Sequence, residues 1–331
     1  MRKIFATSVL ITLGFLASYS QPRMEVLINI RADSLRKILP SKKGIERIDC
    51  LNALAFGILK MWYDETPYMG NSLFDTVFAY STQAHNESKK IKYKRGLGYA
   101  TLRLAQCEVL RYDMDTTGKY EKQKDYFGMS VRYANESILI GKELNDNFLI
   151  GNSYRMLASV EGNKNNSDQR IYYLSTAISY HEKYSNGQQG TYQDIFTKEC
   201  NGCKGNEFLL GELFEELSFA QKDISTTKEY TEKAISYYLK AGEKSSVGGC
   251  YFRLGYIISL RIDFESGIEI MKKSIPYYHE SGNFFGELRS LVRISGAYWG
   301  MGDFENGFDY SKKSVQLADK LAREYKRWFE R

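Results

Sequence analysis

The chain contains little proline and has no long hydrophobic run. Its 331 residues include only 4 prolines, and because proline interrupts helices, long helices are possible almost throughout. The most apolar segment, residues 4–16, is too short to cross a membrane as a helix. Apolar residues make up 43% of the chain, which is typical of a globular core. The sequence therefore favours a folded protein rich in long helices.

The chain also lacks a strong excess of charge of either sign. The chain has 46 basic and 40 acidic residues, a formal net charge of +6, and the two signs are interspersed. Such a pattern is typical of solvated helix faces. It gives no reason to expect a nucleic acid or an acidic membrane as the partner.

Short motifs that carry enzyme chemistry are not found. The sequence has no Walker loop, no G-x-S-x-G elbow, no H-E-x-x-H and no G-x-G-x-x-G between a strand and a helix. Its 3 histidines, His85, His181 and His279, are far apart in the chain, and we expect them at solvated helix ends. We therefore expect no enzyme, no metal and no cofactor.

What the sequence does have is an internal repeat near its C-terminus. Residues 251–267 and 291–307 are two copies of one unit, 40 residues apart. Asp263-Phe264-Glu265 in the first copy matches Asp303-Phe304-Glu305 in the second. A period of this length indicates an array of helical repeats.

Each copy has the apolar pattern of a helix hairpin. Leu254, Gly255 and Ile258 lie on one face of a first helix, and small Gly255 lets a neighbouring helix come close. After a short polar turn, a second stripe follows at spacings of four and three residues: Gly267, Met271 and Ser274. Such hairpins need neighbours to cover their apolar faces.

These positions resemble the tetratricopeptide repeat (TPR) family. The family pattern of large and small residues is filled once by Tyr251, Leu254, Gly255, Ile258, Gly267, Met271 and Ser274, and again by Leu291, Ile294, Ser295, Tyr298, Gly307, Ser311 and Ser314. A third copy reads Tyr154, Leu157, Ala158, Leu174 and Ala177, and weaker copies lie on either side of it. The resemblance implies an all-α, right-handed solenoid of about six hairpins over residues 44–323.

The remaining segments divide the chain. We expect, in order, a signal peptide (1–20), a leading segment (21–43), three TPR-like hairpins (44–184), an irregular loop (185–205), three more hairpins (206–323) and the end of the last helix (324–331). The loop is rich in glycine and shows little periodicity, so the array could bend or split there.

The first 20 residues read as a secretory signal. Arg2 and Lys3 precede the apolar core at 4–16, and small residues come before Gln21. We expect cleavage after Ser20, export to the periplasm or beyond, and no transmembrane segment in the mature chain. An uncleaved membrane anchor is the alternative.

Cys200 and Cys203 are the one pair of cysteines with the spacing of a C-x-x-C motif. In an exported protein a C-x-x-C pair can close a local disulfide, stay as two free thiols, or act in thiol exchange. A disulfide is the first expectation. The other three cysteines, Cys50, Cys107 and Cys250, fall near apolar stripes, and we expect them in the core.

Arginines recur at equivalent places on the first helices, which line the concave groove in the TPR family. The resemblance implies groove candidates at Arg103, Arg155, Arg253, Arg289, Arg293 and Tyr256. Arginine can grip a carboxylate through its planar fork. The partner would then be an acidic or carboxylate-ending protein or peptide. The alternative is that each arginine pairs with a glutamate of a neighbouring repeat.

The signal, leading segment and array are similar to the periplasmic sensor regions of Bacteroidetes-type signalling proteins. The hypothesis is therefore an exported scaffold that binds protein or peptide, or a sensory input module, without catalysis. The alternatives are a thiol-active protein that uses the cysteine pair, or the truncated sensor domain of a signalling kinase or regulator.

Overall fold

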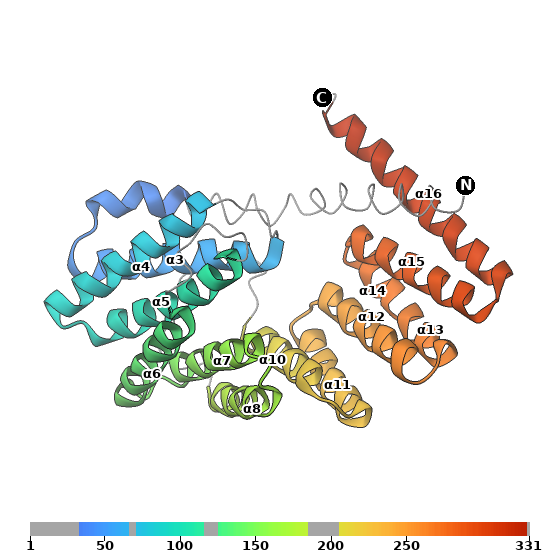
Figure 1. Cartoon of the computed structure of the whole chain (residues 1–331). Coiled ribbons are helices and arrows are strands. Elements are labelled where there is room, and N and C mark those ends of the chain that lie inside the picture. Colours follow the sequence, from blue (N-terminus) through green and yellow to red (C-terminus); the bar gives the residue numbers. More distant parts are fainter. Residues whose placement is uncertain (1–32, 66–70, 116–124, 185–204, 330–331) are drawn as a thin grey trace. The chain divides into compact units, whose positions relative to one another are not determined.

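The computed structural model describes residues 33–65, 71–115, 125–184 and 205–329, and within them it is entirely helical (Figure 1). After a short 3-10 helix at Leu39–Ser41, the α-helices are α3 (Gly44–Glu65), α4 (Asn71–Ile91), α5 (Lys94–Asp115), α6 (Tyr126–Leu144), α7 (Asn147–Asn163), α8 (Ser167–Lys183), α10 (Asn206–Ala220), α11 (Ile224–Lys240), α12 (Lys244–Arg261), α13 (Phe264–Lys272), α14 (Ser274–Glu280), α15 (Phe284–Met301) and α16 (Phe304–Phe329).

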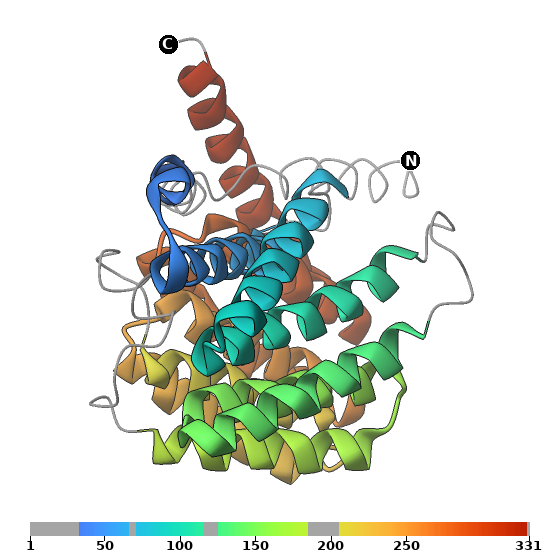
Figure 2. The same cartoon turned by 90° about the vertical axis from the view of Figure 1, so that its left-hand side faces the viewer.

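The described helices belong to two units, one within residues 21–220 and one within 221–331. In the first, α3 pairs with α4, α5 with α6 and α7 with α8, each helix packs on the next, and α10 packs on α8 (Figures 1 and 2). In the second, α11 packs on α12, α12 on α13 and α14, and α15 on α16. This sequential antiparallel pairing confirms the predicted all-α, TPR-like architecture.

The repeated Asp-Phe-Glu motif marks the start of a second helix. Asp263 accepts a hydrogen bond from the backbone N–H of Ser266 at 2.6 Å, and Asp303 accepts one from that of Asn306 at 3.1 Å. An aspartate at this place satisfies an N–H group that the helix itself leaves open. The motif therefore recurs because each hairpin must begin its second helix after a short turn.

Small residues let the paired helices come into backbone contact. A Cβ atom on Gly255 of α12 would lie 2.6 Å from the carbonyl oxygen of Gly267 of α13. In the next hairpin the hydroxyl of Ser295 donates to the carbonyl of Gly307 at 2.8 Å. The close approach predicted at Gly255 is thus present in both copies, each time between residues 12 positions apart.

Large tyrosine side chains fill part of the interior of the hairpins. Tyr99 and Tyr238 are almost fully buried. The hydroxyl of Tyr99 donates to Asp146 at 2.9 Å, and Asp146 in turn caps α7 through the N–H of Leu149. A buried ring with a paired hydroxyl contributes area without leaving a polar group unsatisfied.

One predicted helix is broken. The second helix of the fifth predicted hairpin consists of α13 and α14, which meet at Lys273. Pro276 lies in the first turn of α14. It has no N–H to donate, and its ring crowds the carbonyl four residues earlier, so the helix is interrupted one turn before it.

Other sequence predictions have different outcomes. Cys50, Cys107 and Cys250 are buried, as expected for core residues. Burial raises the pKa of Cys107 and of Cys250 to about 12. The pair Cys200 and Cys203, the signal segment and most of the leading segment lie outside the described residues. Among the helices described, none has the length and apolar character needed to span a membrane.

The Gly255–Gly267 crossing gives a test of the packing. We expect Gly255→Ala to destabilise the protein by roughly 1–3 kcal/mol, because the methyl group collides with backbone that has to move. Gly296→Ala is the matched control, since a Cβ there meets no atom within 4 Å. Alanine should stabilise that exposed helical position by about 1 kcal/mol. Urea midpoints measure both changes, and equal shifts would contradict the crossing.

Candidate functional site

The predicted groove arginines fall in both units. Arg103 lies on α5 and Arg155 on α7, whereas Arg253 lies on α12 and both Arg289 and Arg293 on α15. The surroundings of the two groups differ in one respect that matters for binding. Arg103 and Arg155 make their contacts inside the first unit. Arg289 and Arg293 present guanidinium groups with no described carboxylate beside them.

Arg155 is held by two glutamates of α10. Its Nη1 donates to Glu212 at 2.9 Å, and its Nε donates to Glu216 at 2.9 Å, with a second hydrogen bond from Nη2 to the same oxygen of Glu216. Burial by itself lowers the pKa of Arg155, but the carboxylates of Glu216 and Glu212 raise it well above the ordinary value for arginine. Arg155 therefore ties α7 to α10. This contact matches the alternative to a groove role, in which an arginine pairs with glutamates of a neighbouring repeat.

Arg103 is buried, with only 5% of its surface exposed. Its guanidinium lies 4.5 Å from the centre of the Phe56 ring. Its Nη1 donates to the side chain of Gln106 at 2.6 Å. These contacts use the side chain inside the first unit and leave it little access to a ligand.

Arginines of α15 stack on aromatic residues of α12 in the second unit. Arg289 lies 4.3 Å above the ring of Phe252, and Arg293 lies 4.8 Å above the ring of Tyr256. Both arginines are exposed. Since each pair is one turn apart on its own helix, two cation–π stacks run side by side between α12 and α15.

Arg253 of α12 completes this cluster. Burial lowers its pKa, Tyr278 acts in the opposite direction, and the like charge of Arg289 lowers the pKa further. Arg289 also donates to the hydroxyl of Tyr278 at 3.0 Å. Two positive charges thus lie close enough to repel each other. We use the term arginine face for Phe252, Arg253, Tyr256, Arg289 and Arg293.

The arginine face has the chemistry of an anion site. Within the described part of the chain, neither Arg289 nor Arg293 forms an ion pair with a carboxylate. A guanidinium whose plane rests on an aromatic ring keeps the N–H groups on its edge available. Those groups can donate two parallel hydrogen bonds to a carboxylate.

The sequence indicates the arginines and Tyr256 but not the stacking of Arg293 on Tyr256, nor the contacts of Arg289 with Phe252 and Tyr278. Phe252 and Tyr256 are spaced by four residues, as are Arg289 and Arg293, and this shared spacing is the signal for the stacks. Tyr278 lies on the second helix, and nothing in its sequence neighbourhood indicates that its hydroxyl meets Arg289. The glutamates that hold Arg155 follow it by 57 and 61 residues, beyond the reach of local patterns.

The histidines do not form a site with one another. His279 is exposed and pairs with Glu287 at 2.9 Å, as expected of a solvated helix end. The same expectation is wrong for His181, which is fully buried against Phe148 and Gly151. The missing side chain at Gly151 makes room for the imidazole. No group of three or more potential metal ligands occurs among the described residues.

No protein-family profile matches the sequence, and no curated protein matches it either. The fold is similar to the crystal structure of BtubC (BKLC) from P. vanneervenii, with a TM-score of 0.52 and 13% identity, covering 75% of this chain and 92% of that one. The signal transduction ATPase with a tetratricopeptide repeat sensor from Pyrococcus horikoshii gives a TM-score of 0.48 at 14% identity, covering 93% of this chain and 52% of that one. Aspartyl phosphate phosphatase F from Bacillus subtilis gives 0.47 at 14% identity, covering 86% and 62%.

At this level of identity, the similarity to BtubC shows a shared fold and nothing of function. Together with the observed sequential pairing of helices, it makes the chain a TPR-like helical repeat protein. The arginine face is then the feature of this particular chain from which a function can be argued.

His181 predicts how the stability of the protein depends on pH. Burial, with a smaller contribution from Arg155, lowers its pKa from 6.5 to about 3. The unfolded chain therefore takes up this proton first, so the free energy of unfolding falls as the pH drops from 6.5 towards 3, by at most about 1.4 kcal/mol per pH unit. We expect the urea midpoint to fall less between pH 7 and pH 5 in His181→Phe than in the wild type. An unchanged slope would contradict this assignment, and the exposed His279→Phe is the control.

Proposed function

We propose that the protein is an exported TPR-like scaffold, or the sensory input module of a signalling system, that binds a protein or peptide without catalysing a reaction. The arginine face holds an acidic or carboxylate-ending segment of that partner. The observation that carries this proposal is the pair of exposed arginines, Arg289 and Arg293, stacked on rings of the neighbouring first helix without a described carboxylate beside them.

The contrast between the units supports the choice of these residues. Arg155 has two glutamates, and their charges already satisfy its guanidinium. Arg253 and Arg289 instead raise each other's electrostatic energy, which an incoming carboxylate would relieve. A ligand anion therefore gains more at the arginine face than at Arg155, where it would have to displace a protein carboxylate.

The stacks also prepare the site for binding. An arginine side chain on a flexible stem loses rotamer freedom when it grips a ligand. Resting each guanidinium on Phe252 or Tyr256 fixes part of that freedom before the ligand arrives. The two stacks lie one helical turn apart, so they suit an extended segment with two acceptors, such as a terminal carboxylate and an acidic side chain.

Binding of acidic peptides tests the function directly. A fluorescent peptide library that ends in Asp or Glu with a free carboxylate should bind the full chain, and its amidated counterpart should bind more weakly. Arg289→Ala with Arg293→Ala should weaken binding about tenfold or more, because each charge-assisted hydrogen bond contributes about 1.5–3 kcal/mol. Binding should also weaken as salt is raised.

The control removes the same charge elsewhere. Lys228→Ala with Lys312→Ala takes two exposed positive charges from α11 and α16, which are outside the arginine face. If this pair weakens binding as much as the arginine pair does, only the net charge matters and the proposed site is wrong. Preference for the amidated library would also contradict it.

Export is tested separately. In the native host, mass spectrometry of the purified protein should find an N-terminus at or next to Gln21, because the basic start, apolar core and small residues before it form a cleavable signal. Protein that begins with Met1 and stays in the cytoplasmic fraction would contradict export. It would leave the peptide-binding proposal to be decided by the binding experiment.

A further inference from the structure

Large apolar side chains are exposed where two hairpin turns meet in the second unit. Phe264, at the start of α13, places its ring 3.2 Å from where a Cβ of Gly300 would be. Next to Gly300 on α15 is Trp299, whose ring lies 5.3 Å from that of Phe304 at the start of α16. The two turns thus place three aromatic rings near one another, with Trp299 and Phe304 in contact and Phe264 beside Gly300.

This surface is open to solvent. The exposed fractions are 38% for Phe264, 47% for Trp299, 44% for Met301 and 61% for Phe304. Single exposed apolar residues are ordinary, but several gathered at adjacent turns are typical of an interaction surface. We call these four residues the turn-edge patch. It shares no residue with the arginine face.

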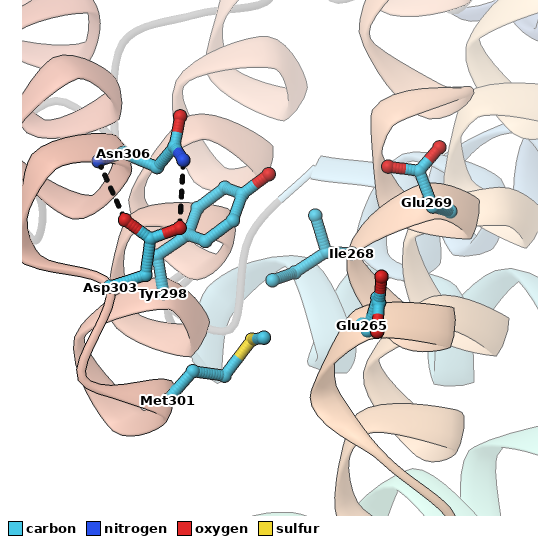
Figure 3. A pocket seen from close by; sticks show the side chains of 7 residues that line it. All are labelled: Glu265, Ile268, Glu269, Tyr298, Met301, Asp303 and Asn306. Carbon is cyan, nitrogen blue, oxygen red and sulfur yellow. Dashed lines mark hydrogen bonds between the residues drawn. The ribbon is translucent and has the colours of Figure 1, made fainter.

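A small pocket of about 250 Å³ opens beside the patch (Figure 3). Its apolar lining includes Ile268 from α13, and Tyr298 and Met301 from α15. Its polar lining includes the carboxylates of Glu265, Glu269 and Asp303. Figure 3 shows the α13 side chains opposite Tyr298, Met301 and Asp303 across the opening.

The pocket retains negative charge. Glu269 pairs with Lys272 at 2.7 Å. Asp303 accepts hydrogen bonds from the backbone N–H and the side-chain amide of Asn306. Glu265 is exposed and forms no ion pair within the described ranges. Three carboxylates line the pocket and one lysine pairs with one of them, so the lining carries more negative than positive charge.

We propose that the turn-edge patch and its pocket form a docking surface for a protein segment that presents Lys or Arg beside an aromatic or aliphatic side chain. The stem of a long basic residue lies along apolar surface while its charged end seeks polar partners. Met301, which is 44% exposed, suits the stem, and Glu265 with Asp303 suits the charge. The neighbouring apolar side chain covers Phe304 and Trp299. This surface is opposite in charge to the arginine face, so it selects a different segment.

The internal repeat supplies a matched control. Glu265 and Glu305 are 40 residues apart, each two positions after the aspartate that caps its helix, and both are exposed. Only Glu265 lines the pocket. Reversing the charge at either site has the same effect on net charge and a comparable effect on the start of its helix. A difference between the two variants therefore reports on the pocket.

The test is a selection of random heptapeptides on phage against the immobilised full chain. We expect selected peptides to be enriched in Arg or Lys next to Trp, Phe or Leu. A synthetic peptide of that type should bind about tenfold more weakly to Glu265→Lys and to Phe304→Ala, and within about twofold of wild type to Glu305→Lys. Arg289→Ala with Arg293→Ala should leave its binding unchanged, so that failure here and failure of the arginine face are distinguishable.

Three results would overturn the inference. The first is a selection that yields no peptides or peptides without basic residues. The second is equal loss of binding in Glu265→Lys and Glu305→Lys. The third is a protein that is dimeric by sedimentation and becomes monomeric on Phe304→Ala, because a second copy of the chain would then occupy the patch.

Discussion

Backbone contact between paired helices is the constraint on which the described hairpins of the second unit depend. The carbonyl of Gly267 lies where a side chain on Gly255 would have to be. At the equivalent place in the next hairpin, Ser295 is accommodated because its hydroxyl donates to the carbonyl of Gly307. The same hydroxyl also lies 2.7 Å from the hydroxyl of Ser311. A small residue is needed at each crossing, and a hydroxyl fits only where it has a partner for its hydrogen bond.

The same solution joins one hairpin to the next. Serine hydroxyls on neighbouring helices meet at Ser137 and Ser153 in the first unit, and at Ser274 and Ser290 in the second, at 2.9 Å and 2.7 Å. Each pair is buried. Helices that approach this closely hold their side chains at a fixed spacing, since interiors are close-packed and tolerate little sliding. The stacking of α15 arginines on α12 rings depends on that fixed spacing.

The sequence predicts the hairpins well because their causes are local. The 40-residue period, the small residues at the crossings and the aspartates that start second helices all lie within one repeat. Contacts between residues that are far apart in the sequence cannot be predicted from these local patterns. The burial of His181 depends on the missing side chain of Gly151, a helix away, and the role of Arg155 depends on glutamates in α10. The break between α13 and α14 has a local cause, Pro276. The amphipathic stripe through Ser274, however, predicts one continuous helix.

The arginines show why equivalent positions in a repeat do not imply equivalent roles. A buried cation costs free energy unless a carboxylate pairs with it. At Arg155 the fold supplies two carboxylates. At Arg253, burial and the like charge of Arg289 lower the pKa, while Tyr278 acts in the opposite direction. Natural sequences break rules of local consistency chiefly at functional or strained sites. The like charges on α12 and α15 depart from such consistency, since Arg289 and Arg293 rest on aromatic rings and form no ion pair with a described carboxylate. The proposed binding of an anion would relieve the repulsion between Arg253 and Arg289.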